Sequence, residues 1–148
     1  MKTPTFFFLT LLAVNLTVGQ SAKKLKSQLI NNIEAEEKAL IGISDKIWNA
    51  AEIAFQEKIS AQTLITYAKA NGFKVEEGVA SIPTAFVASY GSGKPVIGIL
   101  GEFDALPGIS QKMKPIKDPL IKGGAGHGCG HNMFGTASLG AAVAIKKL

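Results

Sequence analysis

The sequence predicts an α/β layered domain, and three observations carry that prediction. Apolar residues recur at helical spacing from about Leu25 to Phe55. The middle of the chain then alternates like a strand and contains an uninterrupted apolar run at Val96–Leu100. Small residues dominate Met133–Leu148, which is typical of a helix that approaches its neighbour closely.

The first helix is predicted from spacings of three, four and seven between its apolar positions, which place them on one stripe. These positions are Leu29, Ile33, Leu40, Ile43, Ile47, Ala51 and Ala54. Lys and Glu fill the opposite face. A second, shorter helix is predicted to begin at Ser60 as its N-cap and to end at Asn71-Gly72, which supplies a left-handed stop.

Strands are predicted where the period changes. Residues 73–76 alternate like an edge strand, and Thr84–Tyr90 is predicted as another strand that ends at the turn Gly91-Ser92-Gly93. Val96–Leu100 has no polar position, so we expect a strand covered on both faces.

Residues 101–131 form a long segment rich in Gly, Pro and Lys, and such segments in small domains are usually functional or mobile. The helix predicted at Met133–Leu148 follows it, with Asn132 as its cap.

The first twenty residues have the pattern of a signal peptide. Lys2 gives a positive start, and the apolar run Phe6–Val18 is shorter than the roughly 20 residues of a spanning helix. Cleavage is expected at or near Gly19. We therefore expect residues 21–148 to be exported to the periplasm or secreted, without a stable membrane anchor. The alternative is a buried core helix.

Composition narrows the classes of partner. An apolar fraction of 47% and a charged fraction of 18% are those of a globular protein. The net charge of +5 comes from sixteen scattered basic residues, every one of them Lys. Nucleic-acid binders favour clustered Arg, so no nucleic-acid partner is expected.

The segment Gly123–His131 holds the single Cys and both His residues of the chain. Cys129 and His131 are two positions apart, so an extended backbone points both side chains to one side. Thiolate and imidazole are good ligands for zinc and similar ions. The other interpretation is a Gly-rich loop with a chance thiol and two solvated imidazoles.

Asp104 lies in Gly101–Gly108, just after the predicted buried strand, where α/β sheets place ligands. A carboxylate there can hold a metal-bound group or a His in one orientation. Asp104 could equally be a cap or turn former.

Three ordered motifs resemble those of one protein family. They are Ile82–Ala88, Gly98–Gly108 and Gly126–Asn132, and Ile47–Glu52 fits the family's first helix. The family is the aminobenzoyl-glutamate hydrolase branch of the metallopeptidase superfamily that includes aminoacylase and glutamate carboxypeptidase. The resemblance implies that residues 21–148 are the N-terminal part of a three-layer αβα zinc-peptidase-like catalytic domain.

The resemblance also implies the site. Cys129 and His131 would be metal ligands, and Asp104 would be the catalytic carboxylate that supports them. His127 and Glu102 would lie beside the ligands. The cofactor would be divalent metal, two ions of zinc or manganese.

By the same resemblance, the activity would be hydrolysis of an amide bond in a small N-acyl amino acid or an aminobenzoyl-glutamate-like substrate. The complete enzyme would be a homodimer or hetero-oligomer. The family's general-base Glu lies beyond Leu148, since no Glu follows Glu102 here. We therefore expect this chain alone to be inactive. The alternative is a truncated, non-catalytic secreted α/β protein with at most weak metal binding.

Overall fold

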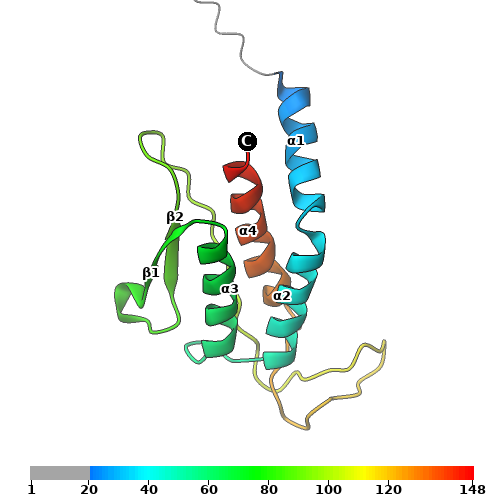
Figure 1. The fold of residues 1–148 in the computed structure, drawn as a ribbon. Coiled ribbons are helices and arrows are strands. Elements are labelled where there is room, and N and C mark those ends of the chain that lie inside the picture. The colour runs from blue at the N-terminus through cyan, green and yellow to red at the C-terminus, as the bar shows by residue number, and fades with distance from the viewer. Residues whose placement is uncertain (1–20) are drawn as a thin grey trace, which may run out of the picture.

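The computed structural model describes residues 21–148, so the predicted signal peptide at residues 1–20 lies outside the described residues. Four α-helices and a small two-stranded sheet make up the fold (Figure 1). The helices are α1 (Ala22–Glu34), α2 (Glu37–Ala50), α3 (Lys58–Ala70) and α4 (His131–Lys146).

The hydrophobic core lies where α2, α3 and α4 meet. Its buried side chains are Ile43, Ile47, Leu64, Ala68 and Leu139. Aromatic and aliphatic side chains from the sheet and from the segment before the long loop pack around them, including Phe73, Val75, Phe86 and Phe103. Within residues 21–148, no helix combines the length and apolar character needed to cross a bilayer.

The predicted single helix at Leu25–Phe55 is wrong, because the chain breaks at Ala35–Glu36 into α1 and α2. The Glu36 amide donates to the Ile33 carbonyl three residues back, and ψ of Glu36 is −2°, which turns the chain out of the helical path. The Glu36 carboxylate accepts hydrogen bonds from Tyr67 and Lys147 and so anchors this corner. Helix α2 ends at Ala51, which has a φ of 43°.

Helix α3 begins two residues before the predicted cap, so the assignment of Ser60 as N-cap is wrong. The Glu52 carboxylate performs the capping instead. It accepts hydrogen bonds from the Ile59 and Ser60 amides, both at 2.9 Å, and from the Ser60 hydroxyl at 2.8 Å. A carboxylate satisfies the free amides of the first turn and interacts favourably with the positive end of the helix.

The predicted end of this helix is confirmed, since Asn71 caps it and Gly72 has a φ of 76°. Strands β1 (Lys74–Glu77) and β2 (Phe86–Ser89) follow and pair antiparallel, with Lys74 opposite Ser89 and Glu77 opposite Phe86. A short 3₁₀ turn, η1 (Val79–Ser81), joins them. Both strands lie within a residue of the predicted segments or inside them.

The predicted buried strand at Val96–Leu100 is not formed. Val96 is 85% exposed, Ile97 78% and Leu100 73%, and no strand of residues 21–148 pairs with this segment. A strand gains its apolar burial from neighbours on both sides, and the described part of the chain offers only α4 on one side. The fold is thus helices plus a small sheet, and the three-layer αβα arrangement stays a prediction.

Helix α4 confirms the predicted close-packing helix of small residues. A Cβ on Gly140 would lie 2.9 Å from Leu40 Cδ1, so this glycine lets α2 approach α4. The predicted capping role of Asn132 is wrong. Gly130, with a φ of 84°, occupies the cap position, and the Asn132 amide is buried and donates to the Ser44 hydroxyl at 3.0 Å.

Candidate metal centre

The segment Gly101–Ala105 brings two carboxylates to the start of α4. Its residues alternate sides. Phe103 stacks on Phe86 in the core with ring centroids 6.0 Å apart, while Glu102 and Asp104 face His131. The Ala105 amide donates to the Glu52 carbonyl at 2.7 Å, which fixes the far end of the segment.

Close contact with α4 sets the height of these carboxylates above the helix. A Cβ on Gly135 would lie 2.8 Å from the Glu102 carbonyl oxygen, and one on Gly101 would lie 3.2 Å from the Ser138 Cβ. The Ser138 hydroxyl also donates to the Leu100 carbonyl at 2.6 Å. The small residues of α4 therefore allow the segment to lie directly on the helix.

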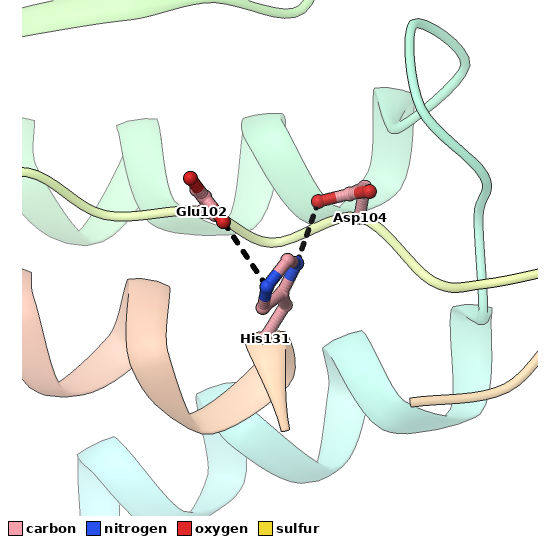
Figure 2. Close-up of side chains that lie close together, drawn as sticks. All are labelled: Glu102, Asp104 and His131. Carbon is pink, nitrogen blue, oxygen red and sulfur yellow. Dashed lines mark hydrogen bonds and ion pairs between the residues drawn. The ribbon is translucent and has the colours of Figure 1, made fainter. Parts of the chain in front are cut away.

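His131 is the first residue of α4, and each of its ring nitrogens faces a carboxylate (Figure 2). Nδ1 lies 2.7 Å from Asp104 Oδ1, and Nε2 lies 3.0 Å from Glu102 Oε2. One ligand atom from each of the three residues can be chosen so that all lie within 4.8 Å of one another. The side chains of His131 and Asp104 are about a quarter exposed and that of Glu102 is half exposed, so the group opens to solvent.

The protons of His131 determine what this arrangement can bind. A neutral imidazole has one N–H, which donates to Asp104 at the shorter distance, and its other nitrogen then presents a lone pair to the Glu102 carboxylate. A lone pair and an anion at 3.0 Å repel each other. Either a second proton on the ring or a cation bound by both atoms removes that repulsion.

His127 lies apart from this group, in the interior of the protein. Its side chain is 4% exposed and its Nε2 donates to the Ile47 carbonyl at 3.1 Å, while Nδ1 is buried without a hydrogen-bond partner. Burial lowers the pKa of His127, although the Ile47 carbonyl and the charge of Asp104 act in the opposite direction. The neutral ring packs beside Trp48 and ties the long loop to α2.

The structure leaves Cys129 exposed and outside the group of Glu102, Asp104 and His131. Its assignment as a ligand stays a prediction. The sequence position of Glu102 left its role open, although a usable signal was present. Glu102 and Asp104 are two apart in an extended segment, so both carboxylates leave the backbone on one side.

Comparison with known proteins places this geometry in a family context. No family model matches the chain. Over 116 residues, the chain is 47% identical to one of the p-aminobenzoyl-glutamate hydrolase subunits of Escherichia coli (strain K12), and the match covers 78% of this chain and 24% of that protein. The chain is related to this hydrolase subunit.

Weaker similarity links the chain to the Xaa-Arg dipeptidases of Homo sapiens and Mus musculus. It is 30% identical to the human protein over 139 residues and 26% identical to the mouse protein over 137 residues, which in each case covers 82% of this chain. The chain spans about a quarter of the length of the curated relatives it matches. The similarity therefore places this amidohydrolase relative among hydrolases and peptidases.

The donor set of this amidohydrolase relative fits a divalent metal ion. Ligand atoms lie about 2.0–2.1 Å from a zinc ion, so two neighbouring ligands on one ion are roughly 3 Å apart, as His131 Nε2 and Glu102 Oε2 are. A metal-bound His usually donates its other N–H to a carboxylate, and Asp104 occupies that position. Glu102 and His131 could thus hold an ion, with Asp104 orienting the imidazole.

Proposed function

We propose that the chain is the metal-binding part of an amidohydrolase that cleaves an amide bond in a small N-acyl amino acid or an aminobenzoyl-glutamate-like substrate. The observation that carries the proposal is the placement of His131 between Asp104 and Glu102, in a chain related to hydrolases and peptidases. A zinc or manganese ion, and a second ion in the complete enzyme, would polarise the scissile carbonyl and lower the pKa of a bound water.

The residues of this chain have separate tasks in the proposal. Asp104 accepts the Nδ1 proton of His131, which fixes the tautomer and leaves the Nε2 lone pair free to bind the ion. Glu102 neutralises positive charge at the same place. Cys129 is proposed as a further ligand, since it precedes His131 by two residues. The general base would come from outside this chain's sequence, because no Glu follows Glu102.

Three further parts of the proposal concern the complete enzyme. We propose that residues 21–148 belong to a three-layer αβα catalytic domain, that the enzyme is exported, and that it assembles as a homodimer or hetero-oligomer. The Escherichia coli relative is by its name one subunit of a hydrolase, which supports assembly from subunits.

Zinc and manganese titration of the purified chain tests the metal centre directly. Calorimetry should detect binding that falls at least tenfold in His131→Ala and Glu102→Gln. Loss of an outer carboxylate typically costs about ten- to a hundredfold in affinity, so Asp104→Asn should weaken binding by about that factor. Glu76→Gln removes an exposed carboxylate of β1 and is the matched control, which should bind like the wild type.

Cys129 is tested in the same preparation by its rate of alkylation. The thiol is exposed, so reaction should be rapid in the presence of a chelator and slower with zinc bound. Equal rates would remove Cys129 from the ligand set and leave the other three residues. Full affinity in His131→Ala would contradict the centre itself. It would favour the second candidate, a non-catalytic protein in which His131 is a doubly protonated partner of two carboxylates.

A further inference from the structure

Residues 109–122 form an ordered loop between the two halves of the candidate metal centre. At its base, Leu106 and Gly126 exchange both backbone hydrogen bonds at 3.0 Å, and the Ser110 amide donates to the Gly124 carbonyl at 2.9 Å. The Ser110 hydroxyl accepts from the Ile121 amide at 3.1 Å. In Figure 1 this segment, coloured yellow to orange, extends away from the helices.

Polar side chains hold the interior of this loop. The Gln111 side-chain amide donates to the carbonyls of Lys112 and Ile116 at 3.0 and 2.7 Å, and its oxygen accepts from the Asp118 amide at 3.1 Å. The Asp118 carboxylate pairs with Lys112 and Lys114 at 2.7 and 2.8 Å. These contacts define the loop's shape without any apolar core.

The apolar side chains of the loop point to solvent instead. Met113 is 97% exposed, Ile121 68%, Ile116 67% and Leu120 59%. Lys117 and Lys122 lie among them and form no ion pair within residues 21–148. The polarity of the loop is therefore inverted, with polar groups inside and apolar groups outside, and its Lys residues outnumber its single Asp.

We propose that residues 109–122 make reversible contact with an anionic lipid surface. Lys side chains near such a surface are attracted to its phosphates, and exposed aliphatic side chains enter the boundary between headgroups and acyl chains. Long Lys stems can lie along the apolar boundary while their ammonium groups reach the phosphates.

The composition of the loop favours lipid over the other macromolecules. Protein interfaces are enriched in aromatic residues and Arg and depleted in Lys, whereas this loop contains Lys and neither of the others. Single-stranded nucleic acids bind on aromatic platforms, which the loop also lacks. The contact is independent of hydrolysis, because it uses none of the residues of the candidate metal centre.

Vesicle co-sedimentation of the purified chain tests this contact. We expect binding to vesicles of equal parts phosphatidylcholine and phosphatidylglycerol, weak binding to phosphatidylcholine alone, and loss of binding at high salt. Lys117→Gln with Lys122→Gln should weaken binding roughly thirtyfold, since each Lys near an anionic surface contributes about fivefold. This pair leaves the Asp118 contacts intact.

The apolar half of the contact is tested by Met113→Ser with Ile116→Ser, which should also weaken binding. The matched control is Val96→Ser with Ile97→Ser, which removes two comparably exposed apolar side chains outside the loop and should bind like the wild type. Circular dichroism checks that all variants fold. Equal binding to both vesicle types, or full binding by the Lys117/Lys122 variant, would overturn the proposal. So would absence of vesicle binding together with self-association lost in the Met113/Ile116 variant, which would assign the loop to a protein contact.

Discussion

Replacing Gly135 by alanine perturbs the contact on which the candidate metal centre rests. The new Cβ would lie 2.8 Å from the Glu102 carbonyl oxygen and 3.2 Å from the Phe103 Cβ, whereas ordinary contact begins at 3.4 Å. Because the nearest atom belongs to the backbone, the segment that carries Glu102 and Asp104 must move away from α4. Overpacking of this kind costs about 1–3 kcal/mol.

A matched substitution isolates that cost. Gly42 lies in the exposed interior of α2, where an added Cβ meets nothing within 4 Å. Alanine stabilises a helix by about 0.5–1 kcal/mol relative to glycine, so Gly42→Ala should gain that amount. Gly135→Ala receives the same gain but also the overpacking penalty. The difference between the two variants is the penalty itself, about 1–3 kcal/mol.

Urea unfolding followed by circular dichroism measures both free energies of unfolding. We expect Gly42→Ala to be more stable than the wild type and Gly135→Ala to be less stable. Zinc affinity should also fall in Gly135→Ala alone, because the carboxylates leave His131. Equal stability of the two variants would show that the extended segment does not lie on α4 as described.

Three other outcomes are expected. Glu36→Gln should lower the free energy of unfolding at neutral pH by about 1 kcal/mol. Hydrogen bonds from Lys147 and then Tyr67 lower the pKa of Glu36, so their stabilisation is present above the ordinary Glu pKa and is lost as pH falls through the lowered value. Unfolding measured across acidic pH should therefore show the wild type and Glu36→Gln converging, and a constant difference would contradict this. Glu52→Ala should destabilise the protein by about 1–2 kcal/mol through loss of the α3 cap, with Glu76→Ala as a control of little effect. Mass spectrometry of the protein expressed with its first twenty residues should find a mature N-terminus between Val18 and Lys23, and an intact Met1 in a membrane fraction would count against the signal peptide.

Local signals in the sequence predicted the parts of the fold that local physics decides. Asn71-Gly72 ends α3 because a left-handed stop needs only those two residues. The small residues of α4 predicted close packing, and Gly135 and Gly140 provide it. The break at Ala35–Glu36 could not be predicted from spacing, because the apolar stripe continues on both sides of it. Its anchors, Tyr67 and Lys147, are distant in sequence.

The candidate site was predicted in part for a similar reason. His131 and Asp104 stood out by residue type and position, and the structure brings them together at 2.7 Å. The participation of Glu102 depends on the extended backbone of its segment, which the alternation with Phe103 could have indicated. The cap of α3 also escaped prediction, since Ser60 has the right residue type but the Glu52 carboxylate reaches the same amides from eight residues away.

Glu52 belongs to two structural units at once. Its side chain binds the first turn of α3, and its main-chain carbonyl accepts the amide of Ala105, the residue after Asp104. Movement of Glu52 would therefore release the start of the helix and the end of the site segment in one event. Protection of the Ile59, Ser60 and Ala105 amides against hydrogen exchange should rise and fall together, as expected of a single cooperative opening unit. A ligand that immobilises Asp104 would then slow exchange at the first turn of α3, although it touches no residue of that helix.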